Sequence, residues 1–234
     1  RQIEKKHWIW IAISGLVSSF FPPFLFAMAQ NHIDSAVASI LNSLTPLATV
    51  VLGVIMFKIL SSRRQIWGVL IGLVGTILLI LAGADFNPDQ NYWYSGLIII
   101  ATIGYAVNVN IIKKYLNDIS ALAVTTGNFI VIFLPALVIL YLSGFFETIL
   151  QNKEMQLSFF YVAILSLVGT AIAKVIFNKL VQIASPVFAS SVTYIMPIVA
   201  VMWGVFDGER FGVLQVMAAA IILFGVYLSN KRSN

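Results

Sequence analysis

The sequence contains no cysteine and only two histidines, and charged residues make up 10% of its 234 positions. The absence of cysteine excludes a disulfide framework, a thiol nucleophile and a thiolate metal site. His7 and His32 lie at the ends of apolar segments, and no carboxylate pair or serine–histidine–acid set can be assembled near either. A glycine-rich phosphate loop is also missing. We therefore expect neither an enzyme nor an ATP-driven protein, and no cofactor.

Apolar residues dominate the chain instead. Hydrophobic residues make up 60% of the sequence, and the mean hydropathy is +0.95. Soluble domains carry roughly 25% charged residues, so this composition predicts an integral membrane protein with the lipid bilayer as its partner. The net charge of +5 comes from bases scattered between apolar runs, and a nucleic-acid partner is not expected. The runs show no strand-like alternation, which excludes a barrel.

Eight segments are long and apolar enough to cross a bilayer as helices, which takes roughly 20 residues each. The connections are short, and the longest, a loop of about 14 residues, is expected between the fifth and sixth helices. The predicted fold class is thus an all-α integral membrane protein, a bundle of eight transmembrane helices. We place the helices at 7–30, 35–57, 65–83, 92–112, 120–142, 157–180, 186–206 and 213–230.

Basic residues between these segments predict the orientation, because Lys and Arg stay preferentially on the cytoplasmic side. If the helices alternate in direction, only Lys153 and Arg210 fall on the other side, which receives most of the acidic residues. Both termini are therefore expected in the cytoplasm and the protein in the inner, or plasma, membrane. The cytoplasmic bases are Arg1, Lys5, Lys6, Lys58, Arg63, Arg64, Lys113, Lys114, Lys179, Lys231 and Arg232.

A polar stripe that ends in proline occurs twice, in segments 35–58 and 186–209, which are 151 residues apart. Its positions are spaced i, i+3, i+4 and i+7, so each stripe lies on one helix face. Such a pattern indicates a helix that does more than anchor the chain. The stripes are Ser39, Asn42, Ser43 and Pro46 in the first segment, and Ser190, Thr193, Tyr194 and Pro197 in the second.

The same offset maps segment 7–30 onto 158–181, and the equivalent helices run in opposite directions. This predicts the inverted-topology repeat of many secondary transporters. Two helices, 92–112 and 120–142, precede the matched segments in the second repeat, and the first repeat lacks their counterparts. We therefore expect a five-plus-five protein whose first two helices precede Arg1. The predicted division is 1–84 for the last three helices of the first repeat, 85–91 for an extracytoplasmic linker, and 92–234 for the second repeat.

The two proline-containing blocks, SAVASILNSLTPLATVVLG and SPVFASSVTYIMPIVAVMWG, resemble those of EamA-type transporters of the drug/metabolite transporter superfamily. A Gly208-Glu209-Arg210 turn and the glycine-spaced stretch from Gly68 to Gly75 add to the resemblance, which covers nearly the whole chain. The resemblance implies ten helices, cytoplasmic termini and export or exchange of small metabolites. One departure is Lys58, which stands where the second repeat has Glu209.

Polar side chains inside the apolar segments are the candidates for a substrate site. Lys174 is the most informative, because a cation within a membrane helix is costly. It could attract an anionic substrate group, alternate its proton, or extend its ammonium to the headgroups. Hydroxyls and amides could instead serve helix packing, as we expect of Asn110 and Asn128, and Gly68, Gly72 and Gly75 are expected to form a close-packing surface. The predicted substrate-binding residues are Asn42, Ser43, Tyr105, Asn108, Lys174, Thr193 and Tyr194, and Pro46 and Pro197 are predicted to gate.

These observations predict a secondary transporter of small metabolites, such as amino acids or related polar compounds, that works by alternating access as a monomer or homodimer. A lipid-carrier flippase subunit is the main alternative, and a non-transporting membrane scaffold is a weaker one. No carboxylate lies in the middle of any predicted helix, which argues against a proton relay built on Asp or Glu within them.

Overall fold

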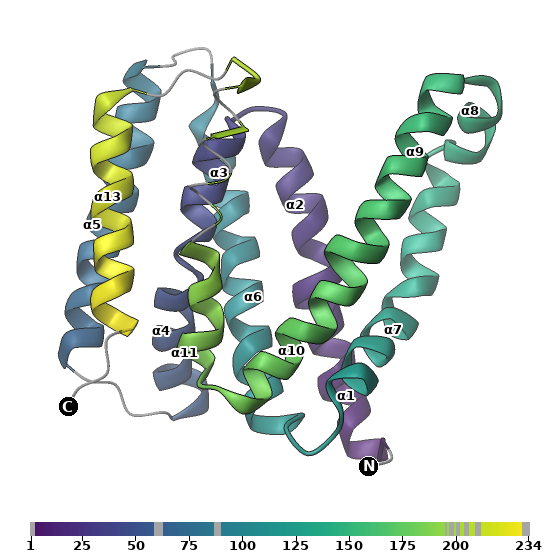
Figure 1. The fold of residues 1–234 in the computed structure, drawn as a ribbon, viewed down its shortest axis with the longest axis horizontal. Helices are drawn as coiled ribbons and strands as arrows, with labels where there is room; N and C mark the ends of the chain where they lie inside the picture. Colours follow the sequence, from purple (N-terminus) through teal and green to yellow (C-terminus); the bar gives the residue numbers. More distant parts are fainter. Residues whose placement is uncertain are drawn as a thin grey trace.

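The computed structural model describes residues 3–58, 63–86, 90–194 and 212–230, together with 196, 199, 202, 203 and 206–208. These residues form a bundle of helices without strands (Figure 1). In this part of the chain, five stretches are long and apolar enough to cross a membrane, and two shorter apolar helices accompany them. The five are Lys5–Gln30, Ser35–Phe57, Tyr92–Tyr115, Ala121–Leu142 and Lys153–Ile183, and the shorter ones are Trp67–Ala82 and Val213–Leu228.

The first span consists of α1 (Lys5–Gly15), a π-helical turn η1 (Leu16–Phe20) and α2 (Phe21–Gln30). Pro22 and Pro23 stand in the first turn of α2. Because proline has no N–H, the carbonyl groups of Ser18 and Ser19 lack their usual helical donors. The π turn precedes these prolines directly, and the N–H of Phe21 bonds to the carbonyl of Leu16.

The second span is divided into α3 (Ser35–Asn42) and α4 (Thr45–Phe57), and a break at Ser43 and Leu44 separates them. Pro46 lies at the start of α4 and cannot donate to the carbonyl of Asn42. The Thr45 hydroxyl donates to that carbonyl instead, at 2.6 Å. The proline stripe predicted from the sequence therefore ends at an interruption of the helix.

The middle of the chain supplies α5 (Arg63–Phe86), a short 3-10 turn η2 (Tyr92–Tyr94), α6 (Ser95–Tyr115) and α7 (Ala121–Leu142). Helix α6 is the central one, since it contacts α1, α2, α3 and α4 and contributes to both apolar cores. One core gathers α2, α3, α5, α6 and α13 around Leu41 and Ile222. The other gathers α1, α4, α6, α7 and α10 around Ile11 and Ile112.

The prediction of a loop between the fifth and sixth helices was wrong. Gly144, with φ of +70°, ends α7, and a further helix α8 (Phe145–Gln151) follows at once. Asn152 then caps α9 (Lys153–Leu165), because its Oδ1 accepts from the N–H groups of Glu154 and Met155. The sixth span thus begins at Lys153 rather than 157. It continues through a second π-helical segment, η3 (Ser166–Ile172), into α10 (Ala173–Ile183).

The expected helix 186–206 begins as α11 (Pro186–Ser190) and a 3-10 turn η4 (Ser191–Tyr194), and most of its remainder lies outside the described residues. The last helix, α13 (Val213–Asn230), pairs along its length with α5. The start of α1 and the end of α13 lie at the same end of the bundle, and α8 lies at the opposite end (Figure 1). The count of eight transmembrane helices and the inverted repeat stay predictions.

Candidate functional site

A cavity of about 600 Å³ lies between α2, α3 and the segment that follows α11, and we call it the α2–α3 cavity. Its size falls within the range of small-molecule sites, which are mostly apolar with a few placed polar groups. The cavity has this mixed character, because aromatic and aliphatic side chains surround a small number of amides and hydroxyls. It is lined by Phe26, Gln30, Ser35, Ser39, Asn42, Val192, Met196, Val199 and Trp203.

Two polar side chains in this lining have unused hydrogen-bonding capacity. The Ser39 hydroxyl is buried and has no hydrogen-bond partner among the residues that the structure describes. The Asn42 amide donates to the Met196 sulfur at 3.5 Å and accepts from the Thr45 hydroxyl at 3.5 Å, and both of these bonds are long. Because an amide can make up to four hydrogen bonds, a bound molecule can gain a bond from Asn42 without breaking a strong one.

Ser43, Thr193 and Pro46, the other predicted site and gating residues of the proline stripes whose side chains the structure describes, do not line this cavity. The hydroxyl of Ser43 is buried and donates to the carbonyl of Ile40 at 2.6 Å. Thr193, half-buried, donates to the carbonyl of Ser190 at 2.9 Å. Pro46 is buried at the start of α4. The side chain of Tyr194 and all of Pro197 lie outside the described residues.

Tyr105 on α6 is half-buried and lies near the cavity wall, since its ring is 6.3 Å from that of Phe26. Asn108, one turn further along α6, belongs to a different group of side chains. Its Oδ1 accepts from the hydroxyl of Ser14 at 2.6 Å, and both residues are buried. Tyr105 and Asn108, predicted to share one helix face, therefore lie in different environments: Tyr105 near the cavity and Asn108 against Ser14.

Asn108 and Lys174 belong to a polar network that connects α1, η1, α6, α7 and α10 and is buried at Asn108 but half-buried at Lys174. Lys174 donates from Nζ to the hydroxyl of Ser18 at 2.9 Å and also to that of Ser19. The Asn128 amide is satisfied at both ends when its oxygen faces Lys174 Nζ, 3.3 Å away, and its nitrogen donates to two backbone carbonyls. Ser14 Oγ lies 3.3 Å from the same amide and continues the network to Asn108.

Most members of this network were not predicted as site residues. Ser14, Ser18 and Ser19 are small residues in an apolar run, which usually indicates helix packing. The paired prolines that follow them are the signal that could have marked this turn, since they free two carbonyls and coincide with a π segment. The ammonium of Lys174 bonds to these side chains rather than extending to a helix end.

Other buried amides hold helices together. Asn110 donates from its amide to the carbonyl of Thr49 on α4 at 3.1 Å, and Asn178 on α10 donates to the Thr125 hydroxyl at 2.9 Å. Such bonds between membrane helices are worth about 0.6 to 2 kcal/mol each. The packing role predicted for Asn110 is confirmed.

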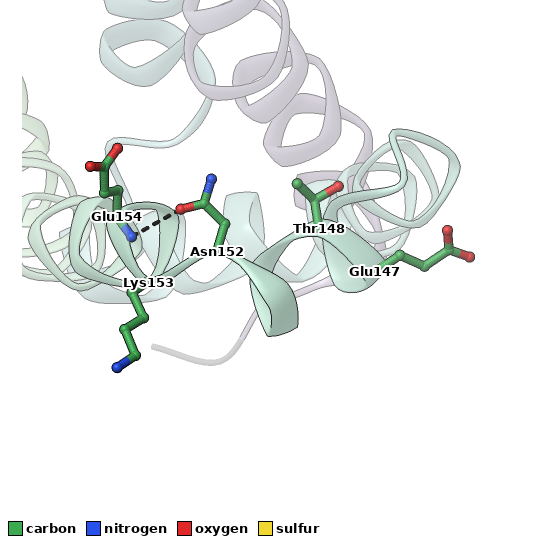
Figure 2. A pocket seen from close by; sticks show the side chains of 5 residues that line it. All are labelled: Glu147, Thr148, Asn152, Lys153 and Glu154. Carbon is green, nitrogen blue, oxygen red and sulfur yellow. Dashed lines mark hydrogen bonds between the residues drawn. The ribbon is translucent and has the colours of Figure 1, made fainter.

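A second recess, of about 620 Å³, lies at the turn between α8 and α9. Figure 2 shows that its side chains diverge: Lys153 points away from Glu154, and Glu147 points out of the recess. The bond drawn there is local, from the N–H of Glu154 to Asn152 Oδ1. The charged groups that line it do not converge on a common point, so this recess is a surface feature of the turn. In the described ranges, no three His, Asp or Glu residues lie close enough to hold a metal ion.

The fold and the cavity describe a multi-pass membrane protein with a candidate small-molecule cavity between its helices. The model of the EamA-like transporter family matches residues 1–81 and 92–231, and the chain belongs to that family. The predicted resemblance is thereby confirmed. Members of this family are described as transporters.

Two relatives are similar to this chain over most of its length. The chain is 27% identical over 200 residues to the uncharacterized inner membrane transporter YedA of Escherichia coli strain K12, a match that covers 85% of this chain and 63% of YedA. It is 26% identical over 237 residues to the WAT1-related protein At3g02690, chloroplastic, of Arabidopsis thaliana, which covers 95% of this chain and 55% of that protein. The chain thus spans less than two thirds of the length of these relatives.

A solved structure, described only as "Crystal structure of protein", superimposes with a TM-score of 0.60 at 17% identity, over 98% of this chain and 76% of the other. At this identity the likeness concerns the fold alone.

Proposed function

We propose that the protein is a secondary transporter that exports or exchanges small metabolites, such as amino acids or related polar compounds, by alternating access in the inner membrane with both termini in the cytoplasm. The observation that carries this proposal is the α2–α3 cavity, whose Ser39 hydroxyl and Asn42 amide have spare hydrogen-bonding capacity among apolar walls. Such a lining suits a molecule with an apolar body and one polar end.

The positions of the helix irregularities support the proposed inverted repeat. Adding 151 residues to η1 gives 167–171, which lies within η3, and the break at Ser43 and Leu44 corresponds to 194–195, at the end of η4. Helices α5 and α13, which occupy equivalent places in the two proposed repeats, pack against each other. Interrupted helices beside a cavity are typical of secondary transporters, where they form gates and binding sites.

The test is transport by the purified protein in liposomes, with a panel of labelled amino acids, nucleosides and a cationic dye. We expect at least one of these to move down its gradient. For the transported compound, the double variant with Ser39→Ala and Asn42→Ala is expected to raise KM about tenfold or more, because it removes two hydrogen-bonding groups from the cavity.

Ser43→Ala is the matched control, because Ser43 neighbours Asn42 but its buried hydroxyl donates locally, to the carbonyl of Ile40. We expect its KM to stay within about twofold of the wild-type value. If no compound moves, the proposal of a metabolite transporter fails. If a lipid-linked compound accumulates in a strain that lacks the protein, the flippase alternative replaces it.

A further inference from the structure

The ammonium of Lys174 is surrounded by uncharged oxygen atoms. Its three N–H donors meet the hydroxyls of Ser18 and Ser19 and the amide oxygen of Asn128. The Ser18 hydroxyl donates its own hydrogen bond to the carbonyl of Ser14 at 2.6 Å, so its oxygen lone pairs are free to accept from the ammonium. Every donor of the protonated lysine is used, and none is left for an anionic ligand.

No carboxylate on the described parts of the surrounding helices neutralises this charge. These helices, namely α1, η1, α2, α6, α7, η3 and α10, contain no Asp or Glu in their described ranges. The charged and titratable side chains on them are Lys5, Lys6, His7, Tyr105, Lys113, Lys114, Tyr115, Tyr141 and Lys179, and none is a carboxylate. His7 pairs with Asp118 in the turn after α6, and Lys113 donates to backbone carbonyls at and beyond the end of α10. The protonated lysine therefore keeps its hydrogen bonds but has no counter-charge among these helices.

The hydrogen bonds between Lys174 and the two serines have no counterpart at the equivalent positions of the proposed repeats. The 151-residue offset places Pro23 in the first repeat at the position of Lys174, and Gly169 and Thr170 in the second at those of Ser18 and Ser19. Gly169 and Thr170 are exposed, and a Cβ built on Gly169 would meet only Leu165. Two inverted repeats that exchange conformations would bring Pro23, which has no ammonium, toward Gly169 and Thr170. The shell around Lys174 belongs to one of the two conformations.

We propose that Lys174 is the proton-binding group that couples this transporter to a proton gradient, a role that rests on the proposed transport function. Protonation of the Nζ lone pair by a proton from bulk water allows Lys174 to bind Ser18, Ser19 and Asn128, which holds α10 against η1 and α7. Loss of that proton to water removes the charge and at least one of the three donated bonds, so the other conformation gains in population. A proton that binds one state better than the other shifts the equilibrium by that difference.

The experiment measures the conformational equilibrium and needs no substrate. The sequence has no cysteine, so spin labels can be attached to Met28→Cys on α2 and Tyr161→Cys on α9, both of which are exposed. The distance between the labels is measured by double electron–electron resonance from pH 5 to pH 10. We expect two distance populations whose ratio follows a single-proton curve in the protein with Lys174.

Three variants test whether Lys174 is the group responsible for the pH dependence. Lys174→Met and Lys174→Arg are expected to show ratios that do not change with pH, since one is never charged and the other always is. Ser19→Ala keeps the lysine but removes one oxygen acceptor, and we expect the midpoint of the curve to fall by about one pH unit. This variant keeps the test decisive if Lys174→Met fails to fold, as judged by its elution and melting temperature.

The proposal is overturned if the ratio does not respond to pH in the presence of Lys174, if Lys174→Met follows the same curve, or if Ser19→Ala leaves the midpoint unchanged. A shift caused by acetate or phosphate at constant pH, absent in Lys174→Met, would make Lys174 an anion-binding residue instead. A pH-dependent equilibrium in a protein that moves none of the tested compounds would leave the proton switch intact and reject the proposed substrates.

Discussion

A Cβ atom built on Gly225 of α13 would lie only 2.5 Å from the backbone nitrogen of Gly72 on α5 and 2.7 Å from the carbonyl oxygen of Gly68. The backbones of these two helices therefore meet without intervening side chains. Glycines allow this approach between membrane helices, where packing rather than the hydrophobic effect drives association. The close-packing role predicted for Gly68, Gly72 and Gly75 is confirmed.

Gly225→Ala is therefore expected to destabilise the protein by about 1 to 3 kcal/mol, because the new methyl group must push two backbones apart. The loss is measured as a lower melting temperature in detergent. Gly96→Ala is the control, since a Cβ on Gly96 of α6 meets nothing within 4 Å. We expect it to be neutral or slightly stabilising. Equal melting temperatures for the two variants would mean that α5 and α13 do not pack as described.

A second prediction concerns the break between α3 and α4. Thr45→Val removes the hydroxyl that satisfies the carbonyl of Asn42, and a buried carbonyl without a partner costs about 1 to 3 kcal/mol. Pro46→Ala restores an N–H that can donate to the same carbonyl. We therefore expect Thr45→Val to cost less in the Pro46→Ala background than alone. Unfolding of the four proteins of this double-mutant cycle gives the coupling energy, and strict additivity would contradict the argument.

Pro46→Ala should also slow transport while it leaves the protein folded. A helix that continues through Ser43 and Leu44 bends less readily, and the proposed gating depends on that bend. The expected result is a lower kcat with a melting temperature equal to or above that of the wild type. Transport at the wild-type rate would show that the interruption is not part of the gate.

The helices and polar faces that depend on the local sequence pattern were predicted well. The length of the apolar runs predicted most of the helices, and the spacing of Asn42 before Pro46 indicated a polar face, of which Ser39 and Asn42 line a cavity. The shell of Lys174 could not be predicted, because it brings together α7, α10 and η1, which lie far apart in the sequence, through small hydroxyls that also occur in ordinary packing. Helix α8 was missed because it is short, and Gly144 before it usually indicates a loop.

His7 was likewise interpreted only as a residue at a helix end, but the structure buries it and places its Nε2 3.1 Å from Asp118 Oδ2. Its Nδ1 accepts the backbone N–H of Glu4, so Nε2 is assigned as the donor to Asp118. Burial raises the pKa of the Asp118 carboxyl, but hydrogen bonds from His7 and from its own backbone, with nearby positive charge, outweigh it. The pKa of Asp118 therefore lies below its ordinary value of 3.8.

This shift predicts how stability depends on pH. A carboxyl whose pKa is lowered in the folded state stabilises the protein above its unfolded pKa, and the contribution is lost as the pH falls through the folded value. Asp118 is partly exposed, so we expect at most about 1 kcal/mol. Asp118→Asn should lower the melting temperature at pH 7, and its difference from the wild type should shrink below pH 4. The exposed Glu147→Gln on α8 is the control; a difference for Asp118→Asn that stays constant down to pH 3 would contradict this assignment.

The orientation is testable with single cysteines, because the sequence has none of its own. Thr148 on α8 and Asn117 in the turn after α6 are both exposed, and these two turns lie at opposite ends of the bundle (Figure 1). Positive charge near the ends of the other helices predicts that the Asn117 end faces the cytoplasm. We therefore expect a membrane-impermeant maleimide to label Thr148→Cys in intact cells and Asn117→Cys only after the membrane is opened.

Ser43→Cys, at a fully buried position, is expected to stay unlabelled in both conditions and reports whether the fold is intact. The reverse pattern for the two exposed positions would place both termini outside, and the α2–α3 turn, which lies at the α8 end of the bundle (Figure 1), would then face the cytoplasm. Labelling of both in intact cells would instead indicate a leaky membrane or a mixed insertion. The labelling result therefore decides which end of the bundle, that of the α2–α3 turn or that of the turn after α6, faces the cytoplasm.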